Sequence, residues 1–296
     1  MTRALAAALV LALGLAAWPA RGEAQAWIRD PGDTYVQLTY RFLRADHFFG
    51  ADGNRTPSAL FRQNALGFYG EVGLVDRWLE LVLTGDLVRR NELPGQGAVT
   101  GLGDWVVGAY TGLVEDPFRL SFGVEVGVPL GDSQPSAGPN ANPFAELVAR
   151  SLPTGDGETD VTFKLALGQS VQPQGSSLDL FGQAVAGYAV RTNGFTDQVV
   201  FRVEGGLRIT EPGWDRFQLI AHVDGRILLG DAAVNAGVAG VGDGVSYVSL
   251  SPELVARIVD GLAGSFAFSA PVYGTNLPAG WEVRAGLSYA LDASEL

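Results

Sequence analysis

The chain has 296 residues, of which 32 are acidic and 20 basic, so its formal net charge is −12. This acid excess argues against a nucleic-acid partner, because a protein that tracks phosphates needs a basic surface. The absence of cysteine excludes disulfides, cysteine-bound metals and thiol nucleophiles. The 40 glycines and the 10% aromatic content, with no long apolar run after the N-terminus, suit a chain that crosses a membrane as a closed barrel of strands.

The N-terminus has the features of a secretory signal peptide. Arg3 precedes an apolar run at residues 4–17, and Ala24-Gln25-Ala26 matches the small-residue cleavage pattern. An uncleaved anchor helix would need about 20 apolar residues, more than this run supplies. No cysteine follows the run to carry a lipoprotein anchor. We therefore expect residues 1–26 to be a cleaved signal peptide and residues 27–296 to form a single domain.

The rest of the chain is a succession of segments in which apolar and polar residues alternate, which indicates strands. In residues 118–128, one face reads Phe, Leu, Phe, Val, Val and Val, and the other reads Arg, Ser, Gly, Glu and Gly. Most segments are longer than the roughly five or six residues of globular strands and suit a tilted crossing of the hydrocarbon layer. The twelve predicted strands are residues 34–45, 60–74, 78–89, 100–113, 118–130, 158–167, 178–191, 198–210, 216–228, 246–258, 262–273 and 281–291.

These segments predict an all-β fold, a closed antiparallel transmembrane β-barrel of about 12 strands. An even number of strands is typical of bacterial single-chain barrels, and so is the alternation of tight turns, such as residues 75–77, with longer connections. We expect short periplasmic turns, longer extracellular loops and both termini in the periplasm of a Gram-negative cell, with the barrel in the outer membrane. A soluble β-sandwich is the alternative, because its strands alternate in the same way.

Aromatic residues lie where an interfacial belt is expected. The last strand, residues 281–291, ends in a polar-x-Gly-x-x-aromatic-x-apolar pattern similar to the assembly signal of outer-membrane proteins, although it stops five residues before the C-terminus. We therefore expect outer-membrane lipid and the barrel-assembly machinery as partners. The predicted aromatic girdle comprises Trp78, Trp105, Phe118, Trp214, Trp281 and Tyr289.

The sequence offers little for catalysis. Twelve-stranded outer-membrane phospholipases use a His, a Ser and an Asn on the lipid-facing surface. Here His222 faces the lumen and has no serine at a matching spacing, and His47 is followed by Phe48-Phe49, which indicates an interfacial loop. The acidic stretch 154–160 suits Ca²⁺ only loosely, and a solvated turn is the simpler interpretation. We expect a protein that is not an enzyme and has no metal or cofactor. An outer-membrane lipid-modifying enzyme is the less favoured alternative.

The polar faces of the strands define a lumen with charges of both signs. Pairing Thr210 with Arg216 places Glu204 opposite His222 and Arg202 opposite Asp224, and opposite charges across strands favour this register. The charges either fill a narrow lumen as a structural network or line a conduit that filters solutes. The candidate lining residues are Arg41, Glu71, Glu80, Asp86, Asp104, Arg119, Glu125, Lys164, Arg202, Glu204, Arg208, His222, Asp224, Arg226, Glu253, Glu282 and Arg284.

The segment GLGDWVVGAY, residues 101–110, has glycine spacings like those of a phosphate-binding loop. It lacks the third glycine of a dinucleotide fingerprint, and a strand rather than a helix follows it, so that function is excluded. As a strand, the segment places Asp104 in the lumen near the outer mouth. Its glycines leave space inside a narrow barrel.

The long connection of residues 131–157 contains a short amphipathic segment at residues 143–152. The connection either folds inward and narrows the mouth or caps the mouth from outside. Loops of this length are usually functional or disordered. We hypothesise that this one is a gate.

Five segments carry a family resemblance: EVGLVDRWLELVL (71–83), GLGDWVVGAY (101–110), FGVEVGVPLGD (122–132), SLPTGDGETDVTFKLALG (151–168) and GSFAFSAPVYGTNLPAGWEVRAGLSY (264–289). They are similar to segments of the outer-membrane transporters grouped with the meta-pathway of phenol degradation. The resemblance spans about residues 60–291 and implies a barrel that passes a small, often apolar or aromatic, solute. The related fatty-acid and aromatic-hydrocarbon transporters carry an N-terminal plug, but only residues 27–33 precede the first strand here, so no plug of that size fits. We expect a channel for passive uptake of a small solute, with a self-plugged structural or adhesive barrel as the alternative.

Overall fold

A computed structural model of the chain describes residues 25–232 and 240–292. Most of the expected signal peptide lies outside the described residues. No helix in the described ranges is long and apolar enough to cross a membrane. The elements are β1 (Thr34–Phe49), β2 (Arg55–Val75), β3 (Leu79–Leu93), β4 (Gly97–Gly101), β5 (Trp105–Val114), β6 (Arg119–Val128), α2 (Pro143–Arg150), β7 (Asp160–Val171), β8 (Leu178–Arg191), β9 (Gln198–Ile209), β10 (Phe217–Leu228), β11 (Ser246–Val259), β12 (Leu262–Thr275) and β13 (Leu277–Leu291).

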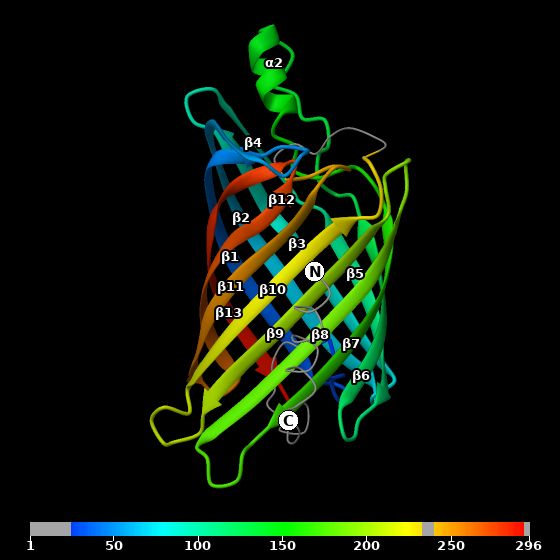
Figure 1. Ribbon diagram of the computed structural model, residues 1–296, viewed down its shortest axis with the longest axis vertical. Coiled ribbons are helices and arrows are strands. Elements are labelled where there is room, and N and C mark those ends of the chain that lie inside the picture. The colour runs from blue at the N-terminus through cyan, green and yellow to red at the C-terminus, as the bar shows by residue number, and fades with distance from the viewer. Residues whose placement is uncertain (1–24, 233–239, 293–296) are drawn as a thin grey trace.

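The strands form one closed antiparallel barrel (Figure 1). Successive strands pair with one another, and β13 returns to pair with β1, which completes the ring. Both β4 and β5 pair with β3, at its two halves, so they share one place in the wall. The barrel therefore has twelve strand positions, and the predicted closed 12-stranded antiparallel fold is confirmed.

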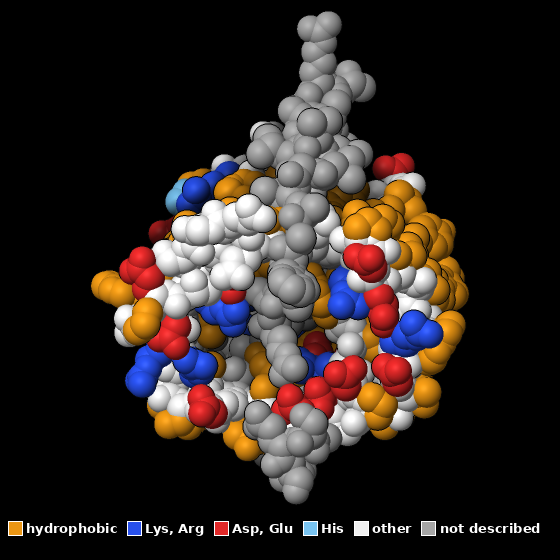
Figure 2. Space-filling model, turned by 90° about the horizontal axis from the view of Figure 1, so that it is seen from below, with side chains coloured by type: hydrophobic (Ala, Val, Ile, Leu, Met, Phe, Trp, Pro, Cys, Tyr) orange, Lys and Arg blue, Asp and Glu red, His pale blue; other side chains and the backbone are white. Residues whose placement is uncertain are grey.

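The wall is apolar outside and polar inside. Leu38 in β1 is 47% exposed, whereas Glu80 in β3 is fully buried. Seen from one end, hydrophobic side chains lie around the outside and charged side chains gather at the opening (Figure 2). This polarity is the reverse of a water-soluble fold and is the pattern of a barrel that faces lipid. The β-sandwich alternative is therefore wrong.

The two ends of the barrel differ. One end, which we call the terminal end, carries the start of β1, the end of β13 and short turns such as residues 76–78 and 260–261 (Figure 1). The opposite end, which we call the α2 end, carries the long connection 129–159 and, between β10 and β11, the described residues 229–232 and 240–245. The predicted alternation of short turns and longer loops is thus confirmed in general.

One connection at the α2 end departs from the prediction. The sequence predicts a loop over residues 274–280, but β12 and β13 are joined by Asn276 alone. Asn276 has a φ of 54°, in the left-handed region that asparagine tolerates better than most residues. Glycine and proline make this stretch look like a loop, yet Leu277 and Pro278 pair with Phe49 and Phe48 and extend the strand.

Candidate functional site: the barrel lumen

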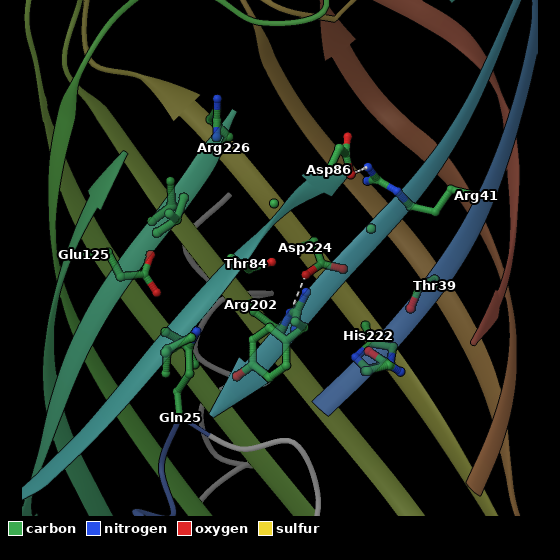
Figure 3. A pocket seen from close by; sticks show the side chains of 18 of the residues that line it. Gln25, Thr39, Arg41, Thr84, Asp86, Glu125, Arg202, His222, Asp224 and Arg226 are labelled. Atoms are coloured by element: carbon green, nitrogen blue, oxygen red, sulfur yellow. Dashed lines mark hydrogen bonds and ion pairs between the residues drawn. The ribbon is translucent and has the colours of Figure 1, made fainter. Parts of the chain in front are cut away.

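A cavity of about 540 Å³ runs inside the barrel. Its walls come from strands all around the ring, and charged side chains from opposite sides point into it (Figure 3). A cavity of this size is within the range of small-molecule sites. Of the predicted lumen residues, those that line it are Arg41, Asp86, Asp104, Glu125, Lys164, Arg202, His222, Asp224, Arg226, Glu253 and Arg284.

Most of these charges are paired across strands. Arg202 Nε lies 2.6 Å from Asp224 Oδ1, and Lys164 Nζ lies 2.7 Å from Glu125 Oε2. Arg41 also forms an ion pair with Asp86. The predicted register of β9 and β10 is confirmed, because Arg202 pairs with Asp224 and Glu204 with His222. The lumen is therefore polar, yet its opposite charges are held close together and offset one another.

His222 lies between two carboxylates. Its Nδ1 is 3.0 Å from Glu204 Oε2, and its Nε2 is 2.9 Å from Glu253 Oε2. His47, at the α2 end, lies 2.7 Å from Asp46. Carboxylates thus face both ring nitrogens of His222, an arrangement that suits a structural ion network better than the His–Ser pair of a lipase.

The N-terminal segment ahead of β1 enters the lumen at the terminal end. The backbone N–H of Arg29 donates to Glu80 Oε2 at 2.8 Å, and Arg29 Nε lies 2.5 Å from Glu71 Oε2. Glu71 and Glu80, both predicted lumen residues, are buried beneath this segment. Trp27 packs against Ala166 and Val185 on the inner wall. A short inner segment therefore narrows the lumen, although no plug of the size found in the fatty-acid transporters is present ahead of β1 in the described residues.

Two glycines make space for this segment. A Cβ on Gly168 would lie 2.6 Å from the ring of Trp27, and a Cβ on Gly73 would lie 2.2 Å from the carbonyl oxygen of Asp30. Sequence reasoning missed Trp27 and Arg29, because residues before the first strand have no periodicity. One feature of the sequence could have indicated a basic residue at this place: Glu71 and Glu80 face inward on neighbouring strands and have no predicted basic partner.

The remaining predicted lumen residues lie away from the cavity lining. Arg119 is 3.8 Å from Glu115 near the terminal end, and Arg208 forms an ion pair with Asp179. Glu282 lies 3.4 Å from Arg284, which does line the cavity. Arg119 and Arg208 therefore belong to ion pairs outside the cavity lining, whereas Glu282 lies next to the lining through its contact with Arg284.

At the α2 end, the long connection 129–159 folds into the mouth. Asp104 accepts hydrogen bonds from the backbone N–H groups of Gly131 and Asp156, each at 2.9 Å. Arg89 donates to the carbonyl oxygen of Thr154 at 3.0 Å, and Asn91 donates to that of Pro153 at 2.5 Å. Asp104, predicted as a pore-lining acid, therefore also anchors the connection.

The helix α2 covers an apolar part of the inner wall. Val148 of α2 and the following Leu152 pack on Phe61, with Leu43, Leu93 and Val99 around them. The opposite face of α2 is open, since Phe144 is 59% and Leu147 67% exposed. Of the two arrangements considered from the sequence, the connection thus adopts the inward one at residues 152–156, while α2 projects above the mouth (Figure 1).

The acidic stretch 154–160 is bound to an arginine. Arg191, at the end of β8, forms an ion pair with Glu158 and lies 3.4 Å from Asp156 and 3.5 Å from Asp243. Burial raises the pKa of the Glu158 carboxyl to about 7, although the Arg191 guanidinium acts in the opposite direction. The carboxylates that loosely suggested Ca²⁺ from the sequence thus surround a guanidinium.

The residues of the predicted aromatic girdle lie at both ends. Trp78, Phe118, Trp214 and Tyr289 are exposed at the terminal end. Trp281 is exposed near the α2 end, where its ring meets Phe42 edge to face at 5.8 Å. Trp105 stacks on Phe68 with ring centroids 6.2 Å apart, over Gly85, which has no side chain to obstruct them.

Comparisons with known proteins identify the fold but do not assign the chain to a family. No family model matches the chain, and no curated protein matches it. The COG4313 outer membrane channel from Pseudomonas putida F1 is similar in structure, with 13% identity, a TM-score of 0.56 and coverage of 93% of this chain and 100% of that chain. At this identity the similarity shows the fold alone, which is an outer-membrane β-barrel.

Two further solved structures have lower TM-scores. The β domain of the Bordetella autotransporter BrkA has 15% identity, a TM-score of 0.47 and coverage of 88% of this chain and 100% of that chain. The KdgM porin in complex with disordered oligogalacturonate has 8% identity, a TM-score of 0.44 and coverage of 86% and 99%.

Proposed function

We propose that this protein is an outer-membrane channel through which a small solute enters passively. The observation that carries the proposal is the cavity of about 540 Å³ along the barrel interior, lined by charges from all sides and enclosed by an apolar outer wall. No covalent step is proposed, because the charged side chains of the lumen bind one another. Binding and permeation are the mechanism.

The solute that we propose is small and apolar or aromatic, on the scale of a phenol. The resemblance of residues 71–83, 101–110 and 264–289 to transporters of the phenol meta-pathway supports this class. The lumen is compatible with it, since paired charges such as Arg202 and Asp224 offset each other and give no strong preference for an anion or a cation. Val82, Val106 and Val185 add apolar surface to the same cavity.

The orientation that we propose places the terminal end in the periplasm and the α2 end outside, because short turns of outer-membrane barrels face the periplasm. The C-terminal strand β13 is the proposed recognition element for the barrel-assembly machinery. A protease site inserted at Gly53, in the turn between β1 and β2, should be cut in intact cells, and cleavage only after permeabilisation would reverse the orientation.

Two constrictions favour a second candidate, a self-plugged structural barrel. Residues 27–30 occupy the terminal end, where Arg29 binds Glu71 and Glu80, and residues 152–156 occupy the α2 end. The two functions differ in one measurable property: a channel conducts when a constriction is loosened, and a plugged structural barrel does not.

The deciding experiment is conductance in planar bilayers together with liposome swelling. Deletion of residues 133–152 should raise single-channel conductance, and swelling should occur with phenol-sized solutes more readily than with disaccharides. An absence of conductance and of swelling in both the full-length protein and the deletion variant would favour the plugged barrel. Release of fatty acids from phospholipid, lost on His222→Ala or His47→Ala, would instead establish the lipid-modifying enzyme.

A further inference from the structure

Three arginines lie side by side on the outward face of the wall near the α2 end. Arg44 in β1 is the register partner of Arg62 in β2, and Arg90 in β3 is the register partner of Asn64, two residues from Arg62. The alternation of the strands places them outside, because Arg44 pairs in register with the exposed Trp281 of β13. We call Arg44, Arg62 and Arg90 the arginine patch.

The positive charges of the patch are poorly compensated within the protein. Like charges directly opposite each other destabilise an antiparallel pair, and Arg44 and Arg62 are such a pair. Glu92, the register partner of Arg62 in β3, lies 3.5 Å from Arg90 instead. Neither Arg44 nor Arg62 makes an ion pair in the part of the chain that the structure describes. An uncompensated basic patch is unexpected in a chain with a net charge of −12.

Aromatic side chains on the same outward face mark the depth of the patch in a membrane. Tyr40 in β1 donates from its hydroxyl to Asn64 Oδ1 at 2.6 Å, and Phe42 packs edge to face on Trp281. Such rings prefer the headgroup level of a bilayer. Arg44 follows Phe42 by two residues toward the α2 end, so its guanidinium reaches the level of the charged headgroups or just beyond.

We propose that the arginine patch binds the phosphorylated headgroup of a glycolipid in the outer leaflet. Guanidinium groups bind phosphate oxygens with paired, charge-assisted hydrogen bonds. Neighbouring strands lie roughly 4.8 Å apart, so the side chains of Arg44 and Arg62 can share one phosphate. A bound phosphate converts the repulsion between the two arginines into attraction to a common anion. The inference rests on the proposed function in one respect, the placement of the α2 end outside the cell.

The test is binding of lipid A with two phosphates to the detergent-solubilised protein, followed by thermal unfolding and native mass spectrometry. The variant Arg44→Gln/Arg62→Gln should bind about tenfold more weakly or worse, because charge-assisted hydrogen bonds are lost at both positions. Without lipid, the same variant should be as stable as the native protein or more stable, because a like-charge pair has been removed. The variant Arg44→Lys/Arg62→Lys should bind with intermediate affinity, since lysine keeps the charge but not the paired donors.

The matched control is Arg77→Gln/Arg257→Gln, which removes two arginines near the terminal end and should leave the lipid affinity unchanged. Equal binding of dephosphorylated lipid A, or equal stabilisation by inorganic phosphate, would overturn the proposal. Equal lipid affinity in the native protein and the Arg44→Gln/Arg62→Gln variant would overturn it as well. Conductance of that variant should be unchanged, so a failure of the lipid inference is distinct from a failure of the channel function.

Discussion

The backbone N–H of Arg29 donates a hydrogen bond of 2.8 Å to Glu80 Oε2, so a residue ahead of the first strand is bound to the inner wall at β3. Glu80 is fully buried, and the side chain of Arg29 reaches Glu71 on the neighbouring strand β2. Two inward carboxylates and one guanidinium therefore hold the N-terminal segment inside the barrel. This contact links the stability of the terminal end to the width of the conduit.

Replacing Arg29 by alanine should both destabilise and open the barrel. Arg29→Ala leaves Glu71 without its basic partner, while the backbone N–H of residue 29 can still donate to Glu80. An unpaired buried charge costs about 3 kcal/mol of unfolding free energy. Urea unfolding measures that loss, and planar-bilayer recording should show a higher conductance. The double variant Arg29→Ala/Glu71→Gln should recover part of the stability. An unchanged conductance would mean that the segment does not limit flow.

A methyl group at Gly168 should displace Trp27 without changing any charge. The Cβ of Gly168→Ala would lie 2.6 Å from the Trp27 ring, so the ring must move, and overpacking of this kind costs about 1–3 kcal/mol. The matched control is Gly205→Ala, whose Cβ would have no neighbour closer than 3.9 Å. In a Trp27→Ala background, the penalty of Gly168→Ala should fall to the part that comes from Ala26, whose Cβ would lie 2.7 Å from the added methyl group. A penalty of equal size in both backgrounds would show that Trp27 does not occupy this place.

Removing Asp104 should release the long connection from the mouth at the α2 end. Asp104→Ala deletes the acceptor for the N–H groups of Gly131 and Asp156, and each hydrogen bond to a charged group contributes roughly 1.5–3 kcal/mol. We expect larger conductance fluctuations and faster proteolysis of residues 131–157. Asp104→Asn, which keeps one good acceptor, should be intermediate. Identical proteolysis of the native protein and of both variants would show that Asp104 does not hold the connection in the mouth.

The packing of the acidic stretch should depend on pH. The pKa of Glu158 is raised from 4.5 to about 7, so the folded arrangement favours its protonated form. Its contribution to stability is therefore fully present below about pH 4.5 and is lost as the pH rises through 7. Hydrogen exchange, corrected for intrinsic rates, should show weaker protection of residues 154–160 at pH 8 than at pH 5. The other charged groups around it are Asp156, Asp160, Arg191 and Asp243.

Glu158→Gln is the control for this pH dependence. Glutamine cannot ionise, so protection should be the same at both pH values and close to that of the native protein at pH 5. A pH dependence that persists in Glu158→Gln would assign it to another group of the cluster.

The alternation of residues was sufficient to predict the barrel and part of its lumen. A period-2 pattern shows which face of each strand meets lipid and which faces the lumen. The positions of the inward charges then predicted the register that pairs Glu204 with His222 and Arg202 with Asp224. The course of residues 27–30 could not be predicted in this way, because Trp27 and Arg29 bind through tertiary contacts. The inward fold of residues 152–156 depends likewise on Asp104, Arg89 and Asn91, which lie far away in sequence.

The sequence patterns also failed to predict how far the strands extend at the α2 end. Residues 46–49 and 55–59 were expected as loop but form paired strands, with a register shift between Ala45 and His47. Residues 97–101 continue the wall opposite Arg89 and Asn91 as the short strand β4. These parts project past the apolar band, where side chains need not alternate between lipid and lumen, so the period-2 signal is lost.

The pairing of β1 with β13 closes the barrel. Thr34 is the register partner of Leu291, so the seam joins strands from opposite ends of the described chain. Bringing them together carries the largest loop-closure entropy in the ring, and such non-local contacts form slowly. Until β13 arrives, β1 presents an unpaired edge that other strands can join. The strand that protects the edge of β1 therefore comes from the far end of the described chain, so the first strand stays open until the barrel closes.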